Sequence, residues 1–330
     1  MNPSARTVLR ICAAAIAAAS LAMPLSAWSQ AFPSKPVKLL TQFAAGSGGD
    51  VLVRIVASAT ADVMGQPVVI ENRPGAGGAL AAELAARAAP DGYTLLAATP
   101  GTHVTRVFLV RNSSFDPVKD FTPITAVGET PTVIIAHPSV PVNSFKELLG
   151  YAKANPGKLS YGTSGIGSPH HLSAEQIKML TGVEMVHVPY KAGAQAMLDV
   201  ITGQIPLSYS IIAPAMPHIK SGKVKALVTV RSKRAMWLPQ IPTVGEMVPG
   251  FDAPASWTGL FGPANLPAPI LRRVNGDVVR AMRQPETTKK INDAGFEVIG
   301  NSPEEFAALI KGQIELTGRI VKAAGIKPTD

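Results

Sequence analysis

Short apolar runs alternate with amphipathic stretches along the N-terminal half of the chain. Apolar runs of four to eight residues predict strands, whereas apolar positions that recur every three or four residues predict helices. The pattern predicts strands at 37–43, 67–71 and 94–98, and helices at 50–64 and 79–88. A strand–helix–strand–helix–strand order is typical of a parallel sheet with helices on its faces.

The alternation begins again in the second half of the chain. The next predicted strands are 132–136, 159–161, 184–188, 207–212 and 224–230, with helices at 144–154, 170–180 and 194–201. A last group has strands at 258–261 and near 297–299, and helices at about 269–282 and 303–324. Ser144, with Glu147 three residues later, is placed to cap its helix. We expect two α/β units and find no repeat of fixed period.

The first 31 residues have the composition of a signal peptide. Arg6 and Arg10 precede an uncharged, alanine-rich run, and Ser29-Gln30-Ala31 has the small residues of a cleavage site. Pro24 interrupts the run, which argues against the alternative of a membrane anchor. We expect a periplasmic protein cleaved near Ala31. The single cysteine, Cys12, lies in this segment, so we expect no disulfide, no cysteine-based metal site and no thiol nucleophile in the exported chain.

Composition narrows the class of protein further. The chain has 330 residues, of which 46% are hydrophobic, and its 29 glycines and 29 prolines are too few for a low-complexity chain. The formal net charge is +9, but the basic residues are scattered and few aromatic residues lie between them. A nucleic-acid surface needs clustered basic residues, so we expect no nucleic-acid partner. A positive field would still help to gather anionic solutes.

Three glycine-rich turns come close to known catalytic or cofactor motifs. The turns at 46–51, 75–80 and 165–170 each lack the third glycine of a dinucleotide fingerprint, and none has a Walker lysine. We therefore expect no cofactor. Ala45-Gly46-Ser47-Gly48-Gly49 approximates a nucleophile elbow, which leaves a secreted serine hydrolase as an alternative. Against it, every histidine lies in the first two-thirds of the chain, whereas the triad histidine of such hydrolases lies near the end.

Adjacent histidines at 170 and 171 are a second candidate feature. On a helix they diverge by about 100°, so they do not form a metal-binding pair as residues four apart do. We expect no metal site. We expect one of the two to face solvent and the other to line a cleft.

Two of the glycine-rich turns are suited to bind an anion. Backbone N–H groups at a helix start are unpaired and carry partial positive charge. Segment 43–50 supplies one such turn and segment 163–168 another, with Ser168 as the expected N-cap and Pro169 as the first helical residue. Two such turns facing each other would bind a carboxylate. Asp50 is expected to hold its turn through backbone N–H groups, and its contact with a ligand is left open.

At these residues the sequence resembles the Bug family, the periplasmic solute-binding receptors of tripartite tricarboxylate transporters. The resemblance covers the chain after residue 31. Its motifs follow in family order: Phe32-Pro33-Ser34-Lys35-Pro36-Val37, segment 43–50, Glu71-Asn72-Arg73-Pro74-Gly75-Ala76-Gly77-Gly78, Pro90-Asp91-Gly92-Tyr93-Thr94-Leu95-Leu96, Phe115-Asp116-Pro117, segment 155–167, Val188-Pro189-Tyr190-Lys191, Gly203-Gln204 and Leu238-Pro239-Gln240-Ile241-Pro242-Thr243-Val244-Gly245-Glu246.

The resemblance implies a fold and a function. The fold would be α/β, a two-lobed periplasmic binding protein fold of type II with the ligand cleft between the lobes. Lobe 1 would span 32–131 and 232–330 and lobe 2 would span 132–231, with crossovers near 130–135 and 226–231. The protein would be a monomer that captures a small carboxylate, a dicarboxylate or an aromatic acid, for transporter membrane subunits. A sensory receptor serving a membrane kinase is an alternative with the same site.

The family's ligand contacts carry over to thirteen positions of this chain. They are Phe43, Ala45, Gly46, Ser47 and Asp50 in lobe 1, and Thr163, Ser164, Gly165, Gly167, Ser168, His171, Lys191 and Ala192 in lobe 2. The chain departs from the family at Ala44-Ala45-Gly46-Ser47, where many relatives have Pro-Gly-Gly. It also departs at Pro206 and Ser210, where acidic residues are common. An ammonium group would lack its partner there, so we expect a ligand without an amine.

Overall fold

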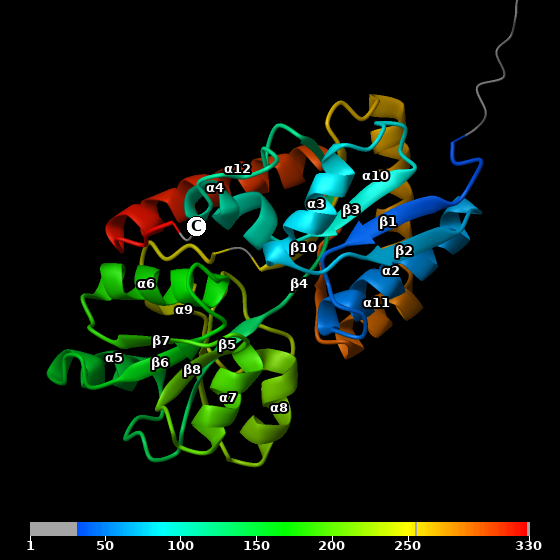
Figure 1. The fold of residues 1–330 in the computed structure, drawn as a ribbon. Coiled ribbons are helices and arrows are strands. Elements are labelled where there is room, and N and C mark those ends of the chain that lie inside the picture. Colours follow the sequence, from blue (N-terminus) through cyan, green and yellow to red (C-terminus); the bar gives the residue numbers. More distant parts are fainter. Residues whose placement is uncertain (1–31, 255, 329–330) are drawn as a thin grey trace, which may run out of the picture. The chain divides into compact units, whose positions relative to one another are not determined.

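The computed structural model describes residues 32–254 and 256–328. Lys35–Asp330 form one compact unit, and every element named below lies within it. This unit contains two separate β-sheets with helices packed on both faces of each sheet (Figure 1). The two sheets define a first lobe and a second lobe.

The first lobe is built on a six-stranded sheet. In spatial order its strands are β11 (Glu297–Val298), β4 (Phe121–Glu129), β10 (Trp257–Pro263), β3 (Thr94–Ala98), β1 (Val37–Thr41) and β2 (Val68–Asn72). Strand β1 is parallel to both β2 and β3, as the alternation of strands and helices predicts. Strand β10 runs antiparallel to β3 and β4, so the sheet is mixed.

The second lobe is built on a five-stranded sheet. Its spatial order is β7 (Val186–Pro189), β6 (Ser160–Thr163), β8 (Leu207–Ile211), β5 (Thr132–Ala136) and β9 (Lys225–Thr229). Strand β6 is parallel to β7 and β8, whereas β5 is antiparallel to β8 and β9. The parallel strands therefore lie at one side of the sheet, away from β9.

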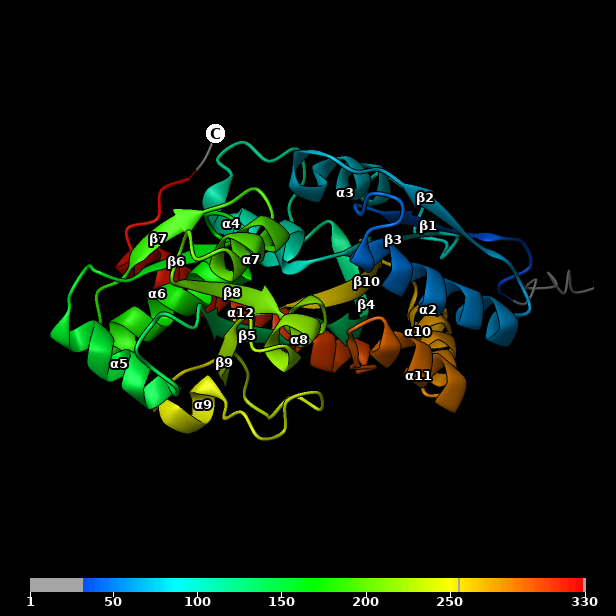
Figure 2. The same ribbon diagram turned by 90° about the horizontal axis from the view of Figure 1, so that it is seen from below.

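Helices cover both faces of each sheet. Those of the first lobe are α2 (Gly48–Met64), α3 (Ala79–Ala86), α4 (Arg106–Leu109), α10 (Ala268–Met282), α11 (Pro285–Asp293) and α12 (Pro303–Ala323), with short turns η1 (Ala76–Gly78) and η2 (Gly101–Thr105). Those of the second lobe are α5 (Phe145–Ala154), α6 (Pro169–Thr181), α7 (Gly193–Ile201), α8 (Ile212–Lys220) and α9 (Val244–Met247). Seen from below, α7 and α8 cover the near face of the second sheet (Figure 2).

Alternation along the buried strands fills a core on each face of a sheet. In β5, Ile134 and Ala136 pack with α5 and α6, whereas Val133 and Ile135 pack with α7 and α8. Successive side chains of a strand point to opposite faces, so a strand buried on both faces must be apolar at every position. This explains why the four residues that follow Thr132 in β5 are all apolar.

The predicted elements are largely confirmed. The strands at 94–98 and 132–136 match residue for residue, and Ser144 caps α5 by accepting the N–H of Glu147. The elements that were not predicted are β4, α8 and α11, together with the short helices α4 and α9 and the turns η1 and η2. Helix α8 was missed because Pro214 and Pro217 suggest a turn, although Pro214 lies in the first helical turn, where no intrahelical N–H bond is required.

Two connections join the lobes, one from β4 to β5 and one from β9 to β10. They are tied together because Thr130 donates both its N–H and its hydroxyl to Ser256 O, at 3.2 and 3.1 Å. After β9, the buried side chains that pack into the cores of the second sheet are Val230, Ala235, Leu238, Val244 and Val248. The lobe limits at 131/132 and 231/232 stay a prediction.

Arg231 forms an ion-pair cluster at this hinge. Its guanidinium binds both carboxylate oxygens of Glu297 in β11, each at 2.5 Å, and also contacts Glu129 at the end of β4. Its side chain is only 11% exposed. Burial, together with the neighbouring Glu297 charge, raises the pKa of Glu129 despite the attraction of Arg231. The cluster therefore links the end of β9 to two strands of the first sheet.

Replacing Arg231 with Met tests this link. Removing the cation leaves two neighbouring, partly buried carboxylates, so the free energy of unfolding should fall by about 2–3 kcal/mol, less than for a fully buried pair. Urea unfolding at pH 7 measures the loss. Arg234→Met is the matched control, because the Arg234–Glu246 pair is exposed and should contribute little to the free energy of unfolding. Equal losses in the two variants would contradict a structural role for the hinge cluster.

Candidate functional site

Two glycine-rich segments lie at the carboxyl ends of parallel strands. Segment 43–50 follows β1 and leads into α2, and segment 163–168 follows β6 and leads into α6. Open α/β sheets bind ligands at this edge, outside the carboxyl ends of their strands. Each segment also ends at a helix start, where backbone N–H groups carry partial positive charge.

The first segment is shaped by a helix cap and by two glycines. Ser47 is the N-cap of α2, and its hydroxyl accepts the N–H of Asp50 at 3.4 Å. Gly46 has φ of +79°, a conformation that favours glycine. A Cβ on Gly49 would collide with the ring of Phe43, so a glycine there lets the ring lie against the first turn of α2. Phe43, Ala45, Gly46 and Ser47 are thus held together at one helix start.

Asp50 holds this segment in place. Its side chain is 1% exposed. It accepts hydrogen bonds from Gly46 N at 2.9 Å, from Arg54 Nε at 2.8 Å and from Asn72 Nδ2 at 2.7 Å. Burial alone would raise the pKa of Asp50, but the hydrogen bonds from Arg54, Asn72 and Gly46 outweigh it, so the pKa lies below its usual value. Asp50 is therefore an ionised support whose oxygens already have partners.

Sequence reasoning missed a polar group beside the first segment. Gln42 donates from Nε2 to Thr99 Oγ1 at 3.0 Å and accepts at Oε1 from the Thr102 hydroxyl at 3.3 Å. Thr99 follows β3 directly, and β3 is parallel to β1. Parallel strands share one carboxyl edge, so the position of Thr99 after the third predicted strand was the signal that could have identified it.

The second segment is also shaped by a helix cap. Ser168 is the N-cap of α6 and Pro169 its first residue, as predicted. The Ser168 hydroxyl donates to Gly165 O at 2.7 Å and accepts the N–H of His171 at 3.2 Å. Gly165 and Gly167 both have positive φ, +111° and +74°. Thr163 Oγ1 accepts the N–H of Gly165 at 3.2 Å, which closes the turn.

The prediction that one of the two adjacent histidines faces solvent is wrong. His170 and His171 are 9% and 6% exposed. His170 contacts Thr132 Oγ1 at 3.3 Å and Ser164 Oγ at 3.2 Å, and His171 accepts the N–H of Gly167 at 3.1 Å. The reason is tertiary, because α6 turns both rings toward the second sheet, where His170 reaches Thr132 of β5 and His171 stacks on His187 of β7.

Lys191 and Ala192 lie beside the second segment. Ala192 is the N-cap of α7, and Lys191 is exposed. The preceding residue, Tyr190, donates its N–H to Thr163 O at 3.1 Å. A Cβ on Gly193 would lie 3.8 Å from Ser164 Cβ. The structure therefore gathers the predicted residues of the second lobe at the carboxyl ends of β6 and β7.

The second segment also touches the first lobe. A Cβ on Gly167 would collide with Leu109 of α4 and would lie 3.3 Å from Thr105 Cγ2. The segment 105–109 follows β3, so the contact involves the same sheet edge that carries Thr99 and the first segment. Gly167 is thus a point where the two lobes approach each other closely.

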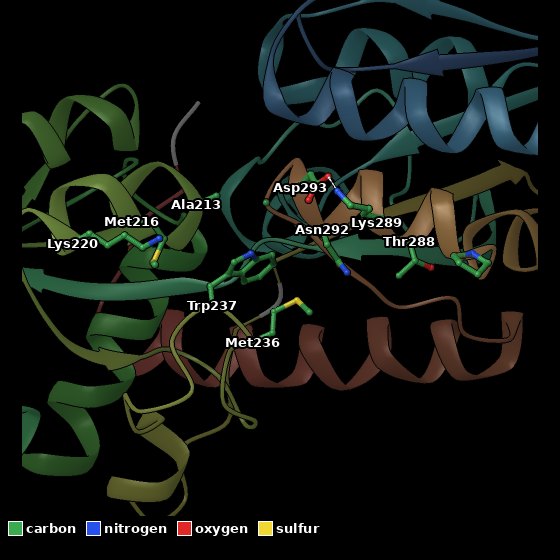
Figure 3. A pocket seen from close by; sticks show the side chains of 11 residues that line it. Ala213, Met216, Lys220, Met236, Trp237, Thr288, Lys289, Asn292 and Asp293 are labelled. Carbon is green, nitrogen blue, oxygen red and sulfur yellow. Dashed lines mark hydrogen bonds and ion pairs between the residues drawn. The ribbon is translucent and has the colours of Figure 1, made fainter.

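A hollow of about 690 Å³ lies elsewhere between the lobes. Met216, Lys220 and Trp237 of the second lobe face Lys289, Asn292 and Asp293 on α11 (Figure 3). Strand β11, which follows α11, is four strands from β1, or about 19 Å across the sheet. Lys289 and Asp293 are exposed and paired with each other at 2.6 Å. The hollow is therefore well separated from the first glycine-rich segment, which follows β1.

The chemistry of the two segments suits reversible binding. The hydroxyl oxygens of Ser47 and Ser168 each accept a backbone N–H and so cap a helix, which leaves neither serine placed as a nucleophile.

Within residues 32–254 and 256–328, no three His, Cys, Asp or Glu side chains are grouped as a metal ion would require. No helix of that described part is long and apolar enough to cross a membrane. The predicted signal peptide at 1–31 lies outside the described residues.

Comparison with known proteins identifies the family of the chain. Residues 52–326 match the tripartite tricarboxylate transporter family receptor. The chain is 32% identical to a UPF0065 protein of Bordetella pertussis, covering 92% of this chain and 94% of that protein. It is 28% identical to protein BugT of the same organism, covering 94% and 95%.

Two solved structures of similar proteins contain a bound acid. R. palustris Rpa4515 with adipate has a TM-score of 0.76 and 34% identity, covering 90% of this chain and 100% of that one. MatC (Rpa3494) from Rhodopseudomonas palustris with bound malate has a TM-score of 0.71 and 34% identity, covering 88% and 100%.

The two lobes and their helix-start segments define a periplasmic binding protein of the two-lobed α/β type, which confirms the predicted fold class. More particularly, the chain belongs to the receptor family of tripartite tricarboxylate transporters, and the predicted resemblance to Bug proteins is confirmed. Members of the family are solute-binding proteins rather than enzymes, so the prediction that this chain is not an enzyme is also confirmed.

The buried histidines predict a loss of stability in mild acid. Burial lowers the pKa of His103 to about 3 and of His170 and His187 to about 4. In the unfolded chain these groups titrate near 6.5. The unfolded state therefore takes up protons first, so stability is complete above about pH 6.5 and falls as the pH drops toward 4.

Urea unfolding at pH 7 and at pH 5 measures this effect. We expect the free energy of unfolding to be lower at pH 5 by at least about 1 kcal/mol. His103 stacks on Phe261 with ring centroids 3.8 Å apart, so His103→Phe should fit and reduce the loss. His218→Phe, in α8, is the control and should leave the loss unchanged. If the pH dependence of stability is the same in His103→Phe as in the wild type, His103 does not contribute to the loss of stability in acid.

Proposed function

We propose that the protein captures a small organic carboxylate, a dicarboxylate or an aromatic acid, between its lobes and presents it to the membrane subunits of a tripartite tricarboxylate transporter. The observation that carries this proposal is the pair of capped helix starts at 43–50 and 163–168. Each offers backbone N–H groups of a long helix at the carboxyl edge of a sheet. Adipate and malate in two similar proteins support the same ligand class.

The ligand contacts proposed here are those that the family resemblance predicts. In the first lobe they are Phe43, Ala45, Gly46 and Ser47, with Asp50 as the buried support of their segment. In the second they are Thr163, Ser164, Gly165, Gly167, Ser168, Lys191 and Ala192, with His171 as the support of its turn. Backbone N–H groups and hydroxyls dominate this set, so no single side chain should carry most of the affinity. We further propose that the exported chain is a monomer cleaved near Ala31.

The charge of the two segments favours an acid without an amine. Asp50 is the one acidic residue in 43–50, 163–168 and 190–193. Its oxygens are already bonded to Gly46, Arg54 and Asn72. An ammonium group that is removed from water without a carboxylate partner is costly to bury. Amino acids should therefore bind more weakly than dicarboxylates of similar length.

Thermal unfolding against a panel of carboxylates tests the proposal. The protein is unfolded and refolded to remove any ligand acquired during expression. A ligand that binds only the native state stabilises it by RT ln(1 + [L]/Kd), or about 2.7 kcal/mol at 100 times Kd. We expect a clear rise in Tm with at least one dicarboxylate or aromatic acid and none with the matching amino acid. If the refolded protein shows no rise in Tm with any acid of the panel, the proposal is wrong.

Gly167→Ala tests where the lobes close on the ligand. An alanine there is strained by φ of +74° and collides with Leu109, so we expect the affinity to fall about tenfold. Adding Leu109→Ala should recover part of the loss. The control is Gly182→Ala at the other end of α6, which has a similar φ of +68° and open space around it. Calorimetric titration that gives the same affinity for both alanine variants would contradict the placement of the cleft.

A further inference from the structure

A buried polar cluster lies directly behind the second segment. Tyr161 and Thr163 are two residues apart in β6 and share a sheet face, and His187 of β7 is the register partner of Tyr161. Helix α6 packs over this face and turns His171, Glu175 and Lys178 toward it at helical spacing. The cluster thus connects the ligand segment with the interior of the second lobe.

His171 contacts the second segment through a neutral ring nitrogen. Gly167 donates its N–H to His171 Nδ1 at 3.1 Å, and a nitrogen that accepts a hydrogen bond carries no proton. The proton therefore lies on Nε2, which faces Glu175 Oε1 at 3.8 Å. The His171 side chain is nearly buried, and its hydrogen bond fixes the direction of the Gly167 peptide. Because Nδ1 already accepts this hydrogen bond, it is not free to contact a ligand at the turn.

His187 contacts the same segment at its other end. Its Nε2 lies 2.7 Å from Thr163 Oγ1, the atom that also accepts the N–H of Gly165. The two imidazoles stack on each other with centroids 4.0 Å apart and planes 12° apart, and Tyr161 also stacks on His187, with centroids 5.2 Å apart. Each histidine therefore holds one end of the turn and also supports the ring of the other.

We propose that His171 and His187 are positioning residues that set the carboxylate-binding shape of segment 163–168, and that they do so only while the His171 ring is neutral. The assignment rests on the proposed function. It replaces the expectation of a direct ligand contact for His171, and it gives a role to His187, which no sequence pattern singled out.

The groups around the two rings determine the sign of the pH effect. Glu175 and Lys178 face them from α6, and Tyr161 and Thr163 face them from β6. Tyr209 of β8 packs edge-on against Tyr161. Burial lowers the pKa of His171, and burial together with the His171 charge lowers the pKa of His187 to about 4. Protonation of His171 would turn Nδ1 into a donor that faces the donor N–H of Gly167. Ligand binding should therefore weaken as the pH falls from 7 toward 4.

Four variants of the full chain separate positioning from packing. His171→Phe and His187→Phe keep an aromatic ring in the stack but remove the nitrogen that contacts the turn. His171→Asn and His187→Gln keep a polar atom near the lost nitrogen. With malate and adipate as probes in calorimetric titrations at pH 7, we expect about tenfold weaker binding for each Phe variant and a change of less than threefold for the Asn and Gln variants.

A fifth variant and a pH series serve as controls. Ser144→Ala removes the cap of α5, where the Ser144 hydroxyl accepts the N–H of Glu147 at 3.2 Å, so it should lower stability and leave affinity unchanged. The His171→Asn variant should bind with less pH dependence than the wild type between pH 7 and 5. Comparing the two proteins in the same buffers cancels the protonation of the probe itself. Equal affinity in the Phe and Asn variants, or identical pH profiles, would overturn the proposal.

A spectroscopic measurement on the wild-type protein tests the proposal even if the variants fail to fold. Nitrogen NMR of the wild-type protein labelled at histidine reports which ring nitrogen carries the proton. We expect His171 to be neutral with the proton on Nε2 at pH 7, and a proton on Nδ1 would overturn the proposal. If wild-type protein binds neither acid, the proposed function fails for these ligands, whereas the tautomer still decides the positioning role on its own.

Discussion

The first N–H groups of a helix have no partner within the helix, and much of this fold is arranged around that constraint. At α2 and α6 a serine cap satisfies one N–H group, while a glycine-rich turn keeps the neighbouring backbone accessible. Both helices start at the carboxyl edge of a sheet. A carboxylate can satisfy the remaining groups of both helices only where the two lobes meet, so the binding proposed here is coupled to lobe closure.

The two turns are held by different chemistry. In the first lobe an ionised carboxylate, Asp50, collects hydrogen bonds from Gly46, Arg54 and Asn72. In the second lobe two stacked imidazoles, His171 and His187, contact the turn at its two ends. Asp50 stays charged through the physiological range because its pKa is lowered, whereas the imidazole support depends on remaining neutral. Acid should therefore weaken the second turn before the first.

Sequence patterns predicted most of the fold and the position of the turns. Periodicity found the strands at 94–98 and 132–136, and cap chemistry found Ser144 and Ser168, because these signals are local. The burial of His170 and His171 could not be predicted, since it depends on contacts with Thr132 of β5 and His187 of β7, which are distant in the sequence. The contact between Gly167 and Leu109 is likewise tertiary. Helix α8 was hidden by its prolines, which local rules assign to turns.

Amide NMR during a titration tests the central claim most directly. The claim is that one carboxylate is held by backbone N–H groups of both helix starts. With adipate as the probe, we expect large shifts for amides in 46–50 and in 165–171, saturating together with a single affinity. Shifts confined to one lobe, or shifts at α8 and α11 without change in either turn, would contradict it.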